Sequence, residues 1–421
     1  MKTKQTVAVI GAGAAGLSAA YYLSRRYAVT LFESASRLGG HAHTVRVTDA
    51  SVGEMGIDIG FIVFNPKTYP LFIQFLEDLG VSSQPSDMAF AYHDKVRDFY
   101  YGSDLPSGLF SQKKHWVSPS FWRFLSQIPE LNRRLLADLK NGVMIGMSLG
   151  QYLQRSSFQE AVLRDYLLPM GAAIWSCPQS VLLDFPAQAF FSFWENHDLL
   201  TLSGRPTWRT VTGGSKTYIE AFQKQFQGTI KIGQPVDAVS SGHTCEHVSL
   251  GGHRLSFDKV VIATHADQAW RLLVDPSETE RSALQPWAYS RNEVVLHTDS
   301  RVMPPRKSAW GSWTVQQSGS DILSMSYYMN RLQALTSSQD YFVSLNPIDL
   351  GADILEKQSA VFARETMYHP IYSQSAIDTH HCLLGLSGQQ NRYFCGSYMG
   401  YGFHEDAVRS GVRVATLLGA I

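Results

Sequence analysis

The feature that most constrains this chain is a glycine-rich turn set between two strand-like runs. Residues 6–10 (TVAVI) are apolar and β-branched, as in a strand buried on both faces of a parallel sheet. The turn at residues 11–16 (GAGAAG) follows, and small and apolar side chains then predict a helix over residues 17–26. Residues 27–32 (YAVTLF) predict a second strand, which delivers Glu33 at its end. This order of elements predicts a βαβ unit.

The glycines and the acid have the spacing that dinucleotide binding requires. Gly11 permits the tight turn, Gly13 lets the backbone approach a pyrophosphate, and Gly16 lets the helix pack close to the strand. The helix N-terminus offers unpaired N–H groups and a partial positive charge to the phosphates, and Ala14 and Ala15 in the turn before it are expected at the cofactor. Glu33, about 20 residues after the turn, is expected to accept hydrogen bonds from the adenosine ribose.

The residues after Glu33 favour a flavin nucleotide over a nicotinamide nucleotide. Ser34 and Arg37 lead into Gly39–Gly40, and a strand-and-turn element over residues 56–60 (GIDIG) follows. This combination, ExxxRxGG and then GxDxG, resembles the FAD-binding signature of the superfamily of flavin amine oxidases, protoporphyrinogen oxidases and phytoene desaturases. The resemblance implies that FAD is bound non-covalently.

In that superfamily the paired glycines pass beside the flavin and the pyrophosphate, which places Gly39, Gly40, Gly60 and Phe61 at the cofactor. The superfamily usually has an arginine directly after the paired glycines, and here that position is His41. A histidine can donate one hydrogen bond to a phosphate, but it is not reliably charged.

Two further segments resemble landmarks of the same cofactor domain. Residues 213–215 (GGS) precede a predicted helix, and residues 259–265 (KVVIATH) form an apolar strand whose turn brings Ala263 and Thr264 to the cofactor.

The C-terminal segment, residues 392–414, again predicts a strand, a glycine loop and a helix. It resembles the second flavin motif, in which an acid after a glycine holds the ribityl chain. Gly396 is followed here by Ser397, whose hydroxyl can make only a lesser bond. The cofactor residues expected in this segment are Gly396, Ser397, Gly402, Phe403 and His404.

These landmarks predict an α/β fold, a Rossmann-like FAD-binding domain with an inserted α+β substrate domain, as in the amine oxidases. The FAD-binding domain comprises residues 1–60, 206–283 and 369–421. The substrate-binding domain comprises residues 61–205 and 284–368, which are rich in Trp, Phe, Tyr and Met. A second GxGxxG is absent from the sequence, so no separate nicotinamide domain is expected.

Several strings, among them GGHAHTV, DIGFIVFN, FWENHDLL and YGFHEDAVRSG, resemble a bacterial branch of the superfamily known as predicted NAD/FAD-binding proteins. Its members are associated with proteins similar to cyclopropane fatty acid synthase. That association implies a substrate among unsaturated or methylated lipid acyl chains.

Composition excludes some partners. Lys and Arg total 36, as do Asp and Glu, so the chain has no net charge with which to hold nucleic acid. The four cysteines are scattered, which predicts neither disulfides nor a zinc site and favours a reducing compartment. No apolar run of about 18 residues occurs, so we expect a cytoplasmic protein without a spanning helix. Peripheral contact with the inner face of the membrane stays open, as does the oligomeric state.

Histidines near the glycine landmarks are the acid–base candidates. His43 and His404 could move protons or orient the substrate, and Tyr401 precedes the same last helix. The alternative is structural, with His43 bonded to loop backbone and His404 capping the helix. Clustered acids or cysteines are missing around the histidines, so no metal is expected.

Aromatic residues of the inserted segments are the candidates for a substrate pocket, although core packing is an alternative role for each. An aromatic pocket favours an apolar substrate over a sugar or a nucleotide. Arg209 could hold a carboxylate head group. With Arg209, the predicted substrate residues are Trp175, Phe193, Trp194, Trp208, Trp310, Trp313 and Tyr328.

The predicted activity is an FAD-dependent oxidation in which a hydride leaves a carbon of a fatty acyl chain and oxygen or a quinone reoxidises the flavin. A double-bond isomerase and an amine oxidase are the alternatives within enzymes. A protein that binds FAD structurally and carries lipid, or serves as an assembly partner, is the alternative outside them.

Overall fold

A computed structural model of the chain describes residues 4–175, 177–201, 206–319, 323–347 and 361–421. Residues 202–205 and 348–360, which the sequence assigns to the substrate domain, lie outside the described residues. Within the described ranges, one sheet consists of five parallel strands. In spatial order they are β10 (Thr229–Ile232), β2 (Ala28–Glu33), β1 (Thr6–Ile10), β14 (Lys259–Ile262) and β20 (Arg392–Phe394).

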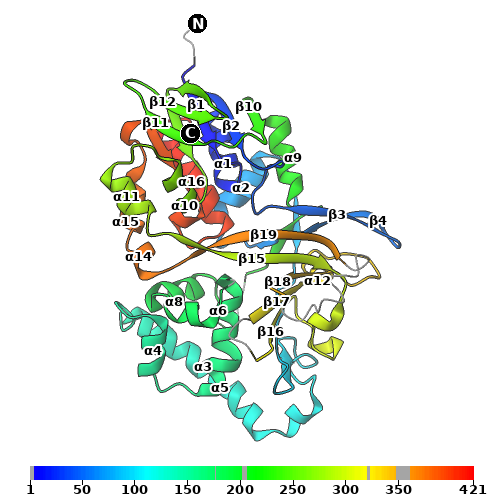
Figure 1. The fold of residues 1–421 in the computed structure, drawn as a ribbon. Helices are drawn as coiled ribbons and strands as arrows, with labels where there is room; N and C mark the ends of the chain where they lie inside the picture. Colours follow the sequence, from blue (N-terminus) through cyan, green and yellow to red (C-terminus); the bar gives the residue numbers. More distant parts are fainter. Residues whose placement is uncertain (1–3, 176, 202–205, 320–322, 348–360) are drawn as a thin grey trace.

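This five-stranded sheet is buried because its central strands are apolar on both faces. Val7, Val9 and Val261 are fully buried in one core with the small residues of α1 (Ala14–Leu23). Helix α16 (His404–Leu417) lies against α1, and the absence of a side chain at Gly411 permits the approach, since a methyl there would overlap the carbonyl oxygen of Ala15. The two helices run side by side below the sheet (Figure 1).

A second sheet has seven strands in the part of the chain that the structure describes. It is antiparallel except where β7 and β16 pair in parallel. Its order is β19 (Val361–Ile371), β15 (Ala288–His297), β18 (Phe342–Leu345), β17 (Leu323–Tyr328), β16 (Trp313–Gln317), β7 (Phe90–Asp94) and β8 (Phe99–Gly102). The long strands β15 and β19 cross the middle of the molecule, between the five-stranded sheet and the remaining strands (Figure 1).

A group of helices forms the other side of the inserted region. The longest, α3 (Pro119–Lys140), begins with Pro119 after the N-cap Ser118, whose hydroxyl accepts from the backbone N–H of Phe121. Its apolar face packs on α8 (Ala187–Asn196), which carries Phe190, Phe191 and Trp194 into the core. The other helices of the group are α4 (Leu149–Arg155), α5 (Glu160–Val162), α6 (Leu168–Trp175) and α7 (Gln179–Leu183).

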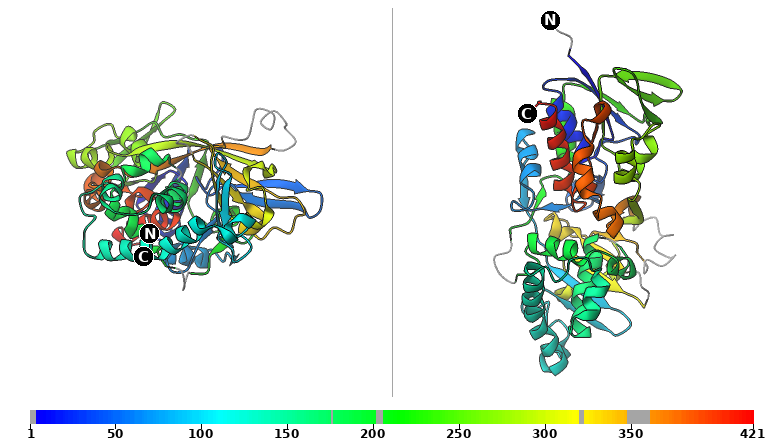
Figure 2. Two further views of the ribbon diagram at one scale, coloured as in Figure 1. Left: turned by 90° about the horizontal axis from the view of Figure 1, so that it is seen from below. Right: turned by 90° about the vertical axis from the view of Figure 1, so that its left-hand side faces the viewer.

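Figure 2 shows an elongated molecule in which these helices and the seven-stranded sheet lie at the end opposite the two chain termini. No helix in the described ranges is long and apolar enough to cross a membrane. The four cysteines, Cys177, Cys245, Cys382 and Cys395, are free thiols.

Shorter elements connect the two sheets. Strands β3 (Thr44–Asp49) and β4 (Gly53–Asp58) form a ribbon, and β5 (Val63–Phe64), β9 (Arg209–Val211) and β6 (Ser83–Pro85) form a small sheet. Strands β11 (Ala238–Ser241), β12 (Glu246–Leu250) and β13 (His253–Phe257) form an antiparallel sheet beside the five-stranded one. The remaining helices are α2 (Pro70–Asp78), α9 (Lys216–Gln225), α10 (Ala266–Leu272), α11 (Glu278–Leu284), α12 (Met329–Leu332), α14 (Gln374–Ile377) and α15 (His380–Leu386).

A buried ion cluster joins β20 to two of these elements. Arg392, which is fully buried, donates through Nε to Glu246 on β12 at 2.8 Å and through Nη1 to Glu280 on α11 at 3.5 Å. It also donates through Nη2 to the hydroxyl of Ser241 at 2.8 Å and to Asp275. Glu246 and Glu280 are themselves about as buried as the arginine. Each charge therefore depends on the others for its compensation.

Replacing Arg392 should destabilise the protein strongly. Arg392→Leu leaves two buried carboxylates without their cation, so we expect the free energy of unfolding to fall by about 3–5 kcal/mol in urea titrations. Arg133→Ala is the matched control, because Arg133 and Glu130 form an exposed pair on α3 whose loss should change the free energy of unfolding far less. Equal losses in the two variants would contradict the assignment of the cluster as a structural centre.

Candidate active site

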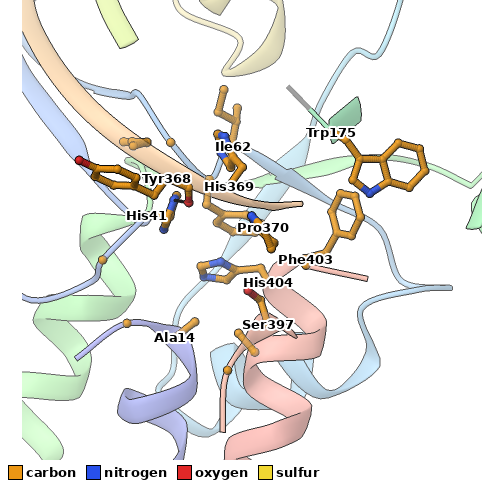
Figure 3. Close-up of a pocket in the computed structure, with 18 of the residues that line it drawn as sticks. Ala14, His41, Ile62, Trp175, Tyr368, His369, Pro370, Ser397, Phe403 and His404 are labelled. Carbon is orange, nitrogen blue, oxygen red and sulfur yellow. Dashed lines mark hydrogen bonds between the residues drawn. The ribbon is translucent and has the colours of Figure 1, made fainter. Parts of the chain in front are cut away.

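A cavity of about 650 Å³ is lined by residues of both large sheets and of the helical group. Its lining falls into two sets. One set is rich in glycine and comes from the carboxyl ends of β1, β2, β14 and β20, where ligands bind in open α/β sheets. The other set is apolar and comes from the inserted region. In Figure 3, Ala14 and Ser397 lie at one end, Trp175 lies at the other, and His41, His369 and His404 lie between them.

The glycine turn has the form that a pyrophosphate needs. Gly11 adopts a φ of +99° and its N–H donates to the carbonyl of Phe32, which turns the chain from β1 into α1. A methyl at Gly16 would overlap the carbonyl oxygen of Gly11, so only glycine lets α1 begin here. A methyl at Gly13 would meet nothing within 4 Å, because this position faces the cavity.

The N-terminus of α1 can bind an anion, and the first turn of the helix carries no acidic side chain that would take this place. Gly13 is its N-cap and provides no side chain, so the first N–H groups of the helix have no capping side chain among the described residues. Ala14 and Ala15 line the cavity at this point. The free N–H groups and the open space beside Gly13 together fit the pyrophosphate of FAD.

Glu33 and the paired glycines complete this end of the cavity. The Glu33 carboxylate accepts from the N–H groups of Ala12 and Ala35, both at 2.8 Å, and keeps lone pairs for ribose hydroxyls. Gly39 donates its N–H to the carbonyl of Ala12, and a methyl at Gly40 would lie 3.2 Å from the Cα of Gly13. The two glycine segments therefore form one wall.

Arg37 and His41 line the same wall. Arg37 donates through Nη1 to the carbonyl of Gly40 at 2.8 Å, which holds the glycine segment in its shape. His41 lies 3.0 Å from the carbonyl of Tyr368 through Nε2, so this nitrogen carries the proton and donates to β19. The Nε2 proton, which could have been donated to a phosphate, is therefore donated to β19. This hydrogen bond connects the cofactor wall to the seven-stranded sheet.

Asp58 is the anchor of the GxDxG segment. It is 1% exposed, and its carboxylate accepts from the backbone N–H and the hydroxyl of Ser215 at 2.8–3.0 Å and from the hydroxyl of Thr44. The amide of Gln333 reaches it from the inserted region. Burial raises the pKa of Asp58 to about 6. Gly60 and Phe61, which line the cavity, follow directly on this fixed point.

The C-terminal segment supplies a third wall. Gly396 donates its N–H to the hydroxyl of Ser410, and Ser397, Gly402 and Phe403 line the cavity. His404, the first residue of α16, stacks on Phe61 with ring centroids 3.7 Å apart and lies 2.9 Å from the Tyr218 hydroxyl.

The two acids after His404 have structural partners. Glu405 accepts from the N–H groups of Leu71 and Phe72 at the start of α2, and Asp406 accepts from those of Tyr401 and Phe403. Burial raises the pKa of both carboxyls. These acids therefore hold α16 and its loop in place.

Four histidines meet in the middle of the cavity, and two of them were not expected from the sequence. His41 lies 5.7 Å from His265 and 5.5 Å from His369 between ring centroids. Burial lowers the pKa of His265, His369 and His404 to about 3 in each case, and it also lowers the pKa of His41. All four rings are therefore neutral at ordinary pH.

Sequence signals for the two unexpected histidines differ. His265 follows the KVVIAT strand directly, so its position at a carboxyl end is a signal that could have identified it. His369 has no comparable signal, because it lies on a strand of the other sheet.

The apolar set contains four of the predicted substrate aromatics, Trp175, Phe193, Trp208 and Trp313, together with Tyr401. Phe193 stacks on Phe403 with ring centroids 4.6 Å apart. Residues of this set that the sequence did not single out include Met88, Phe90, Met170, Ile174, Leu199, Tyr327 and Leu345. Nothing in their local sequence marks them, and they come from five separate segments.

Five predicted residues and Gly16 lie outside the lining. Trp194 is fully buried in the helical core, and Trp310 packs on Tyr328, which bonds to Asp340. Arg209 donates to the hydroxyl and the carbonyl of Ser83. His43 lies 3.8 Å from Glu365. For Trp194, Arg209 and Tyr328 the next residue back in the chain does line the cavity, so helix or strand phase turned these three side chains away from it.

The lining is nearly free of permanent charge. Among the described residues that line the cavity, Glu33 and Arg37 alone are permanently charged, and both belong to the glycine-rich set. The apolar set has no carboxylate, lysine or arginine in the described lining. The indole N–H of Trp313 and the hydroxyls of Tyr372 and Tyr398 are buried without a hydrogen-bond partner in the described structure. The chemistry of the apolar set suits a neutral and largely apolar ligand.

Comparison with known proteins agrees with this architecture. The sequence model of a family described as flavin containing amine oxidoreductase matches residues 14–367. A putrescine oxidase bound to putrescine has a similar structure, with a TM-score of 0.71 and 15% identity over 99% of both chains. The cyclohexylamine oxidase of Brevibacterium oxydans IH-35A has a TM-score of 0.71 and 14% identity over 99% of this chain and 98% of its own.

A fatty acid isomerase from P. acnes, which produces CLA, gives a TM-score of 0.66 and 14% identity over 99% of both chains. At such identities the likeness concerns the fold. No curated protein sequence matches this chain.

The family match and the fold confirm the predicted Rossmann-like FAD-binding architecture with an inserted region and confirm FAD as the cofactor. FAD is held non-covalently, and no cysteine occurs among the described residues of the lining.

Two glycine-to-alanine changes should separate cofactor binding from folding. In Gly13→Ala the methyl enters the cavity, so we expect FAD affinity to fall at least about tenfold while the free energy of unfolding without FAD changes by less than about 1 kcal/mol. In Gly16→Ala the methyl meets backbone, which should destabilise the fold by about 1–3 kcal/mol or more. Fluorescence titration with FAD and urea unfolding measure the two effects. Unchanged FAD affinity in Gly13→Ala would contradict the placement of the pyrophosphate.

Proposed function

The chain belongs to the flavin containing amine oxidoreductase family and is an FAD-dependent oxidoreductase, and on this premise we propose that it oxidises an unsaturated or methylated fatty acyl chain. A hydride leaves one carbon of the chain and a proton leaves the neighbouring carbon as a double bond forms, and oxygen or a quinone later accepts the electrons. The observation that carries the proposal is the uncharged apolar set of the cavity, which would surround a hydrocarbon without desolvating a charge.

Bound FAD supplies the hydride acceptor, and the protein supplies position and exclusion of water. The glycine turn and the N-terminus of α1 would hold the phosphates, and Glu33 would hold the ribose. Trp175, Phe193 and the other apolar side chains orient the acyl chain. His404 is the predicted acid–base residue that lines the cavity, with Tyr401 beside the same wall, whereas His43 would act only from outside the lining.

The residues of the lining also indicate which polar group the substrate carries at its end. Arg209, the residue predicted to hold a carboxylate, is engaged by Ser83 and lies outside the described lining. The unpaired indole N–H of Trp313 could instead donate to a neutral acceptor such as an ester carbonyl. An esterified acyl chain therefore fits this cavity better than a free fatty acid.

Two other activities remain as outcomes of the test. A double-bond isomerase would use the same cavity and return the hydride, and the isomerase from P. acnes is a structural neighbour. An amine oxidase is the activity of the putrescine and cyclohexylamine oxidases. The lack of a carboxylate in the described apolar lining gives an ammonium group no partner there, which favours the acyl chain.

Anaerobic mixing of the holoenzyme with defined lipids tests the proposal. We expect a phospholipid with monounsaturated chains to bleach the flavin and to yield a product that has lost two hydrogens by mass spectrometry. Trp313→Phe should slow bleaching at least about tenfold, whereas Trp310→Phe, outside the lining, should change it less than about threefold. An unchanged product mass would indicate isomerisation, and bleaching by putrescine but not by lipid would overturn the proposal.

An exposed aromatic patch supports contact with a membrane surface, from which such a substrate would come. Trp116, Val117 and Trp122 are 53%, 81% and 47% exposed, and Phe110 stacks on Trp116 at 4.0 Å between centroids. Lys113 and Arg123 are exposed on the same short stretch of chain. This cyan segment before and at the start of α3 forms the end of the molecule opposite the five-stranded sheet (Figure 1). Aromatic and basic side chains together suit an anionic bilayer.

Vesicle cosedimentation tests this contact. We expect the holoenzyme to sediment with vesicles of phosphatidylcholine and phosphatidylglycerol, and to do so several-fold less at high salt. Val117→Ser should reduce the bound fraction, and Val274→Ser, at an equally apolar and 64% exposed position elsewhere, should not. Equal binding by these two variants would rule out the patch as the docking surface.

A further inference from the structure

Hydrogen bonds through two amides, those of the buried Asn292 and the half-buried Asn346, lead from the backbone of β15 to the cavity and end at His369. Asn292, on β15, is 1% exposed and contacts Asn346 on one side and His369 on the other. Asn346 follows β18, and His369 lies on β19, so three neighbouring strands of the seven-stranded sheet supply the three residues. None of these residues was singled out by the sequence.

The direction of every hydrogen bond in this series follows from one backbone group. The N–H of Glu293 can only donate, and it does so to Oδ1 of Asn346 at 3.0 Å. The amide nitrogen Nδ2 of Asn346 then donates to Oδ1 of Asn292 at 2.8 Å. This leaves Nδ2 of Asn292 to donate to Nδ1 of His369 at 2.9 Å, and the same nitrogen also reaches the carbonyl of Ser290. If either amide group were turned over, its nitrogen would face another N–H donor.

This series of hydrogen bonds fixes the tautomer of His369. Its Nδ1 accepts a hydrogen bond, so a neutral ring carries its proton on Nε2. Burial, together with the neighbouring His41 and His265, lowers the pKa of His369 to about 3, so the ring is neutral. In the described structure no residue accepts a hydrogen bond from Nε2 of His369, and the residue lines the cavity. A preset N–H donor is therefore available to a ligand.

The donor lies on the cofactor side of the cavity. His369 is next to His41, which follows the paired glycines, and His41 is next to His265, which follows β14. Both neighbours belong to the wall that fits FAD, and the predicted substrate aromatics are not among the ring contacts of His369. Figure 3 shows His369 close to His41 and above His404.

We propose that the Nε2–H of His369 donates a hydrogen bond to an acceptor atom of the flavin ring, and that Asn292 and Asn346 are positioning residues that impose this tautomer. A reduced flavin ring carries more negative charge than the oxidised ring. A fixed neutral donor stabilises that charge, and its own protonation state does not change. The inference rests on the FAD site and holds for any substrate, so the failure of the acyl-chain proposal would leave it standing.

Histidine tautomers can be read directly from the holoenzyme. With nitrogen-15 labelled histidine, NMR of the FAD-loaded protein should show His369 protonated on Nε2. In Asn292→Asp the carboxylate can only accept, so the proton should move to Nδ1, and the visible spectrum of the flavin should shift. His297 is an internal reference, because the N–H of Asp299 donates to its Nδ1 and Ser344 lies 2.8 Å from its Nε2. Its signals should not change.

Cofactor affinity is a second readout. His369→Phe should weaken FAD binding roughly threefold to tenfold, the range expected for one hydrogen bond. His380→Phe is the matched control, since His380 stacks on Trp287 outside the described lining, and its FAD affinity should not change. An Nδ1–H signal for His369 in the wild-type holoenzyme would overturn the proposal. So would a His369→Phe variant with unchanged FAD affinity and flavin spectrum.

Discussion

The close packing of Gly16 against the carbonyl of Gly11 fixes where α1 begins, and the other walls of the cavity are positioned relative to that point. It lets α1 start directly at the end of β1, with its N-terminus open to the cavity. The paired glycines 39 and 40 then pack on this turn, and the segment that follows them contacts β19 through His41. A side chain at Gly16 would push the helix off the strand and displace each of these walls in turn.

Asp58 extends this constraint from the cofactor wall to the inserted region. One buried carboxylate binds the ribbon of β3 and β4, the turn before α9, and the amide of Gln333, which follows α12 in the inserted region. Because a buried carboxylate needs several donors to offset its desolvation, these three segments are held at fixed separations. These hydrogen bonds hold the glycine-rich set and the apolar set of the cavity next to each other, although the two sets belong to segments far apart in the chain.

Neutral groups dominate the interior of the site. The five histidines of the described lining have lowered pKa values because they are buried, and His41 lowers the pKa of His265, His369 and His404 further. Charge is confined to Glu33 and Arg37 at the nucleotide end of the described lining. A hydride-transfer site of this kind can stabilise developing charge with oriented dipoles while it holds a hydrocarbon beside them. The proposed function and the proposed role of His369 both depend on this division.

Much of the cofactor end was determined by the sequence alone, since β1, the glycine turn, α1 and β2 are formed by neighbours in the chain, and a turn without side chains has few conformations. The same holds for Gly39, Gly40 and the loop before α16, whose motifs are local. The apolar end could not be predicted in this way. Phe193 lines the cavity and Trp194 fills the core, although both aromatics lie on α8, because helix phase relative to distant strands decides which side a residue faces. His369 acquired its partners only when β15, β18 and β19 paired, and hydrogen bonds between strands far apart in sequence leave no local pattern to detect.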